Sequence, residues 1–61
     1  MKTLVYGLNT DFRNHKEWIE QNYNVCGYYD ADKSRIPDTS GIDLELNPEM
    51  IHEFDIVLVA A

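Results

Sequence analysis

The hydrophobic positions of this chain fall into short apolar runs, separated by one amphipathic stretch and by polar loops. Thr3–Tyr6 is almost continuously apolar, and so is Ile56–Val59 within the longer segment Asp55–Ala60. Uninterrupted apolar runs of this length are typical of strands that are buried on both faces of a parallel sheet. We therefore expect both segments to be central strands of one sheet.

A helix is predicted over residues 11–21, directly after a turn at Gly7. Three residues before it or at its start are favourable N-caps: Asn9, Thr10 and Asp11. Its apolar stripe consists of Phe12, Ile19 and Tyr23. Its polar face carries two i,i+4 pairs of opposite charge, Arg13–Glu17 and Lys16–Glu20. The apolar stripe is more simply explained as a packing face than as a binding face.

The middle of the chain predicts two further strands. Asn24–Asp30 contains several β-favouring residues, and Gly27 within it indicates a bulge or a close backbone approach. Cys26 lies in the same apolar run, so we expect a small buried side chain there. After a polar loop over residues 31–41, Ile42–Leu46 alternates apolar and acidic residues, which predicts a half-exposed edge strand.

Asn47 and Pro48 begin a short predicted helix that ends near Glu53. The element order is then β-α-β-β-α-β. The crossover rule gives a minimal three-layer α/β unit with a mostly parallel sheet, strand order 3-2-1-4 and helices on opposite faces. Gly7–Thr10 and Ala60–Ala61 would then follow the two adjacent strands where the order reverses, which is where such sheets bind ligands. The chain stops at this point, so we expect a single, partial domain.

The length and charge of the chain limit the classes of partner that we expect for it. With 61 residues the core is small, so we expect support from a second copy or from a larger parent protein. A net charge of −6 disfavours nucleic acid and anionic membranes as partners. The start of the chain does not resemble a signal peptide, and no apolar run is long enough to span a bilayer, which predicts a cytoplasmic protein.

The turn after the first strand is the main candidate for chemistry. Dinucleotide-binding turns follow the pattern G-x-G-x-x-G, and here Gly7, Asn9 and Phe12 stand at the three glycine positions. Gly7 can make the tight turn, whereas the side chain of Asn9 hinders close approach of a pyrophosphate. Two interpretations stay open: a turn that offers amide groups to a phosphate, and a turn that only connects strand to helix.

Asp30 ends the second predicted strand, 23 positions after Gly7. An acidic residue at about this spacing binds ribose hydroxyls in dinucleotide-binding folds. The alternative is that Asp30 and Asp32 form a solvated turn. Arg13, in the first helical turn, either faces a phosphate or pairs with Glu17 across the helix surface.

The segment VYGLNTDFRNHKEWIEQNYNVCGYYDADK, Val5–Lys33, resembles a Rossmann-like domain of bacterial surface-polysaccharide biosynthesis proteins, of the cholinephosphotransferase type and related glycan-modifying proteins. The ending PEMIHEFDIVLVAA, Pro48–Ala61, is similar to the closing segment of such domains. The resemblance implies a ligand-binding region with these residues: Gly7, Leu8, Asn9, Thr10, Asp11, Arg13 and Asp30.

Two functions from different classes follow. The first is a module that binds a nucleotide or nucleotide-sugar, linked to surface glycan biosynthesis, with NAD or another nucleotide as the small-molecule ligand. The second is a non-catalytic scaffolding or homo-oligomerisation module with a vestigial ligand turn. No catalytic residue and no metal ligand set is predicted, because His15 and His52 lack ligand spacing and no complete active site is visible.

Overall fold

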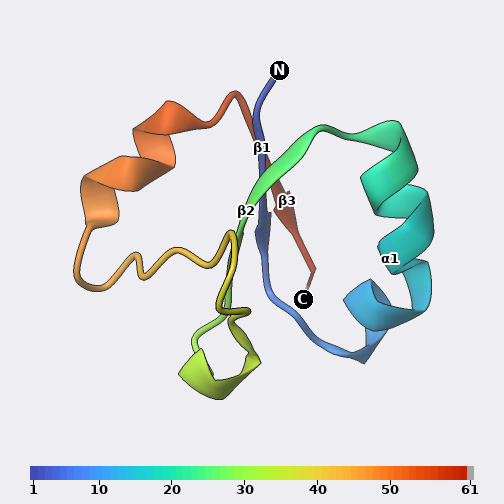
Figure 1. Ribbon diagram of the computed structural model, residues 1–61, viewed down its shortest axis with the longest axis horizontal. Helices are drawn as coiled ribbons and strands as arrows, with labels where there is room; N and C mark the ends of the chain where they lie inside the picture. Colours follow the sequence, from blue (N-terminus) through green and yellow to red (C-terminus); the bar gives the residue numbers. More distant parts are fainter. Residues whose placement is uncertain (61) are drawn as a thin grey trace.

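The computed structural model describes residues 1–60 and consists of a three-stranded parallel sheet between two helical layers (Figure 1). Its strands are β1 (Thr3–Tyr6), β2 (Val25–Tyr29) and β3 (Ile56–Val59), in the order β2-β1-β3. The prediction of a parallel sheet with the first strand in its interior is confirmed.

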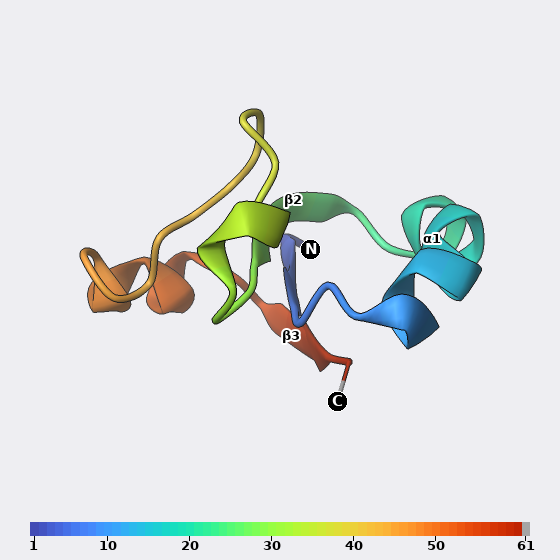
Figure 2. The same ribbon diagram turned by 90° about the horizontal axis from the view of Figure 1, so that it is seen from below.

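The helical elements cover opposite faces of the sheet, as Figures 1 and 2 both show. The α-helix α1 (Thr10–Asn22) lies on one side, and the 3₁₀-helix η2 (Pro48–Glu53) lies on the other. A further single-turn 3₁₀-helix, η1 (Lys33–Arg35), follows β2. The prediction that the two crossovers lie on opposite faces is therefore confirmed.

Two small apolar clusters hold these layers together, one on each face of the sheet. On the α1 face the buried cluster consists of Val5, Leu8 and Phe12. On the η2 face it consists of Leu4, Tyr29 and Ile42. Alternate residues of β1 serve opposite faces, as the pleat of a strand requires, so β1 is buried on both.

The prediction of an edge strand over Ile42–Leu46 is wrong. Gly41 makes one isolated parallel bridge to Tyr28 on the outer side of β2, and the chain then turns away. The Asp43 carboxylate accepts the backbone N–H groups of Glu45 and Leu46, at 3.0 and 3.4 Å. This local turn replaces the strand pairing that the alternating pattern predicted, so the four-strand order reduces to the three observed strands.

The pairing of β1 with β2 is irregular at Cys26 and Gly27. Gly27 lies at an irregularity of the β1–β2 register, which passes from Thr3–Val25 to Leu4–Gly27. Of the two alternatives predicted for Gly27, the irregular register agrees with the bulge. A Cβ atom on Gly27 would lie 2.5 Å from Ile42 Cδ1 and 2.8 Å from Phe54 Cζ, which are side-chain atoms, so the close approach is not one of backbone. The irregularity leaves Cys26 without a register partner and exposed, and the prediction of a buried thiol is therefore wrong.

Candidate functional site

The carboxyl ends of β1 and β3 meet at the turn after β1, where the direction of the strand order changes. Gly7 has φ = +105°, a conformation that other L-residues rarely adopt. A Cβ atom at this position would overlap the carbonyl oxygen of Ala60, which follows β3. The N–H of Gly7 donates to Tyr29 O at 2.8 Å, so this one residue connects all three strand ends. Ala61, predicted to lie at the same edge, is outside the described residues.

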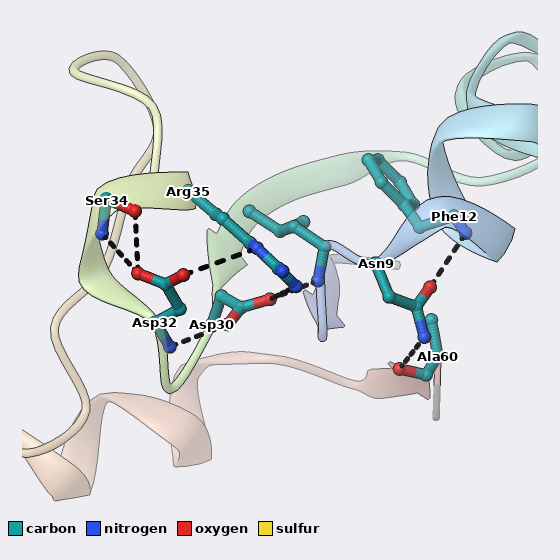
Figure 3. A network of polar contacts seen from close by, with 8 residues as sticks. Asn9, Phe12, Asp30, Asp32, Ser34, Arg35 and Ala60 are labelled. Atoms are coloured by element: carbon teal, nitrogen blue, oxygen red, sulfur yellow. Dashed lines mark hydrogen bonds and ion pairs between the residues drawn. The ribbon is translucent and has the colours of Figure 1, made fainter.

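Asp30, directly after β2, is bound into this turn. Its Oδ2 accepts the N–H of Leu8 at 2.6 Å, and its Oδ1 accepts the N–H of Asp32 at 2.7 Å (Figure 3). These two donors, Leu8 first, hold the pKa of the Asp30 carboxyl below its ordinary value, against the opposing effect of burial. Asp30 is therefore a buried carboxylate, and only Asp32 belongs to a solvated turn.

The Asn9 side chain caps α1 and also bonds the residue that follows β3. Its Oδ1 accepts the N–H of Phe12 at 3.0 Å, and its Nδ2 donates to Ala60 O at 3.1 Å (Figure 3). This reciprocal use of the amide explains why Asn stands where a dinucleotide-binding turn has glycine. The side chain links the start of the helix to the end of β3, two elements that are 51 positions apart in the chain.

Three backbone N–H groups at the start of α1 remain available. Within residues 1–60, the amides of Asn9, Thr10 and Asp11 donate to no protein acceptor. They project from the positive end of a 13-residue helix, where anions are stabilised. The exposed carboxylate of Asp11 lies in the same turn, so the amides alone form a weak site for an anion.

Arg13 is exposed one position beyond the buried Phe12. The expected pair between Arg13 and Glu17 is not among the ion pairs of residues 1–60, whereas the Lys16–Glu20 pair is present at 3.7 Å. Arg13 instead borders an open groove beside the turn. Its guanidinium is therefore available to an external anion.

The groove measures about 390 Å³ and lies between α1, β2 and the loop that follows η1. It is lined by Leu8, Phe12, Arg13, Lys16, Glu20, Tyr28, Arg35, Pro37 and Thr39. The rings of Phe12 and Tyr28 meet edge to face, with centroids 5.8 Å apart. Burial, and then the Glu20 carboxylate, raise the pKa of Tyr28, which stays a neutral donor to Glu20 at 3.3 Å.

Of the residues predicted from sequence, the structure brings four together at the strand ends: Gly7, Leu8, Asn9 and Asp30. Thr10 and Asp11 lie in the adjoining helical turn, and Arg13 faces the groove. Sequence reasoning missed Lys16, Tyr28 and Arg35, because they come from three elements that only the fold brings together. A signal did exist, since three of the five Lys and Arg residues border this one groove.

The groups gathered at the turn and the groove are hydrogen-bond donors, a carboxylate and cations. Within residues 1–60, no cluster of three His, Cys, Asp or Glu side chains is arranged to hold a metal ion. His15 is exposed on α1, where its Nδ1 lies 2.9 Å from the carbonyl oxygen of Asp11. The site therefore offers amide donors, one buried carboxylate and nearby cations.

Comparison of the chain with protein families, with curated proteins and with solved structures finds no match. The resemblance to surface-polysaccharide proteins accordingly stays a prediction. Within the described part of the chain, no helix has the length and apolar character needed to cross a bilayer.

Proposed function

We propose that this domain binds a nucleotide or a nucleotide-sugar at the carboxyl edge of its sheet. One observation carries the proposal: the buried carboxylate of Asp30 and the glycine turn are in direct contact, through the 2.6 Å bond from Leu8 N–H to Oδ2. A carboxylate after the second strand, beside the turn after the first, is the arrangement that binds ribose next to phosphate in open α/β sheets.

The ribose and the phosphate of such a ligand each have a counterpart on the protein. Each oxygen of Asp30 accepts one backbone N–H, and a carboxylate oxygen can accept more than one hydrogen bond, so a ribose hydroxyl can still donate to it. The amides of Asn9, Thr10 and Asp11 suit a phosphate oxygen. The proposed link to surface glycan synthesis rests on the sequence resemblance alone.

Titration followed by amide chemical shifts tests this function. The labelled protein is titrated with UDP, CDP and NAD, and we expect the shifts to be concentrated at Gly7–Asp11 and Asp30. Asp30→Asn should weaken UDP binding, whereas Asp38→Asn, which removes an exposed carboxylate from the loop after η1, should not. Unchanged spectra at millimolar ligand would refute the proposal.

A second function is favoured by the edge of the sheet at β3. Among residues 1–60 this strand pairs only with β1, and its sequence IVLV contains no charge and no proline. Val57 and Val59 are exposed, Val59 by 67%. An uncharged, exposed edge strand can pair with another chain, so a scaffolding or self-association module is the alternative. Sedimentation at several protein concentrations distinguishes it, because only this alternative requires a dimer in the absence of ligand.

A further inference from the structure

The groove beside the turn concentrates positive charge in an acidic protein. The chain carries 5 Lys and Arg residues against 11 Asp and Glu residues, yet three of those cations line the groove with a single acid, Glu20. Arg13 and Lys16 come from α1, and Arg35 comes from η1. The groove therefore attracts anions although the molecule as a whole repels them.

The three cations differ in the ion pairs that they form with neighbouring carboxylates. Arg13 forms no ion pair within residues 1–60. Lys16 has its exposed contact to Glu20, at 3.7 Å. Arg35 lies between two carboxylates, with Nε 3.5 Å from Asp32 and Nη1 3.9 Å from Asp30 (Figure 3). The Lys16–Glu20 and Arg35–Asp32 contacts are exposed and long, and such contacts contribute little to stability. A phosphate dianion can therefore compete for these side chains.

Arg35 also connects the groove to the proposed ribose site. Its guanidinium lies beside the Asp30 carboxylate (Figure 3), with Nη1 nearest to Oδ2, the oxygen that also accepts the N–H of Leu8. Leu8 and Phe12, which form the inner wall of the groove, belong to the buried cluster on the α1 face. The wall is thus a fixed apolar surface, with Arg13 and Lys16 on the α1 rim of the groove and Arg35 on the η1 rim.

We propose that this groove is a phosphate site, in which Arg13 and Arg35 hold the phosphate of an organic phosphate ligand from opposite rims and Lys16 adds a third charge. The inference rests on the proposed function for the rest of the ligand, and it adds the side chains that hold the phosphate. Two guanidinium groups suit this role because each can donate two parallel hydrogen bonds to a phosphate.

The test compares UMP, uridine and inorganic pyrophosphate at low ionic strength, by calorimetry and by amide chemical shifts. We expect UMP to bind more tightly than uridine, and Arg13→Gln and Arg35→Gln each to weaken UMP by about tenfold, the loss expected for a charge-assisted hydrogen bond. Uridine affinity should not change. Lys2→Gln, which removes an equal charge far from the groove, is the matched control, and the amide spectrum of each variant reports that the fold is kept.

The outcomes separate this inference from the proposed function. If UMP binds more tightly than uridine with shifts confined to Gly7–Asp11 and Asp30, and Arg13→Gln and Arg35→Gln leave UMP affinity unchanged, the phosphate groove is refuted and the nucleotide site stands. If pyrophosphate shifts Arg13 and Lys16 while no nucleoside or nucleotide perturbs Asp30, the groove stands and the nucleotide proposal is refuted. If Lys2→Gln weakens binding as much as Arg13→Gln, the attraction is a general charge effect and the groove is refuted.

Discussion

Replacing Gly7 by alanine tests whether the turn after β1 depends on glycine. The backbone there has φ = +105°, which costs an L-residue about 1–3 kcal/mol. The new Cβ would also overlap the carbonyl oxygen of Ala60, a backbone atom that moves only if the end of β3 moves. Overpacking of this kind adds about 1–3 kcal/mol. A domain of this size has only about 3–5 kcal/mol from its core, so Gly7→Ala should remove most of its stability.

Urea unfolding followed by far-ultraviolet circular dichroism measures this effect. Gly27→Ala is the matched control, because its Cβ would meet side-chain atoms, Ile42 Cδ1 and Phe54 Cζ, which can shift. We therefore expect a smaller loss for Gly27→Ala, about 1–3 kcal/mol. The argument from backbone conformation is wrong if Gly7→Ala has the same midpoint urea concentration as the parent chain, or a higher one than Gly27→Ala.

Three further substitutions test other contacts. Thr3 is fully buried, and its Oγ1 has no hydrogen-bond partner within residues 1–60. Thr3→Val should therefore raise the free energy of unfolding, measured in urea, by about 1 kcal/mol. A loss of stability would mean that the hydroxyl is hydrogen-bonded. The lowered pKa of Asp30 means that its carboxylate stabilises the fold above the unfolded pKa, near 3.8, and that this contribution is lost as the pH falls through the lower folded value. Asp30→Asn should therefore reduce the acid-side dependence of stability, and an unchanged pH profile would contradict the assignment. If β3 mediates self-association, Val59→Lys should abolish any concentration-dependent dimer in sedimentation, and a dimer that persists would exclude this edge.

The Asn9 side chain illustrates why sequence reasoning located the turn without describing it. The residue was visible as an N-cap, and it does accept the N–H of Phe12. Its second bond, to Ala60 O, joins residues 51 positions apart and follows only from the meeting of β1 and β3. The same holds for the groove, since no pattern within α1 shows that Arg35 will lie across from Arg13.

Local competition explains the principal error in the predicted fold. The alternation of Ile42–Leu46 satisfies the pattern of a half-buried strand, but a strand also needs a neighbour along its whole length. Only Gly41 bridges Tyr28 before the Asp43 carboxylate binds the next amides and turns the chain, leaving Leu46 75% exposed. A side chain that bonds its own backbone is a short-range alternative that hydrophobic periodicity does not register.

By itself, the sequence determined the three parallel strands, α1 and the glycine turn, because continuous apolar runs, helical periodicity and a residue free to adopt positive φ act locally. Tertiary structure alone decided that Asp30 is buried against Leu8, that Cys26 is exposed, and that Arg13 and Arg35 border one groove. These features depend on strand register and on contacts between distant segments, which are settled only when the layers pack.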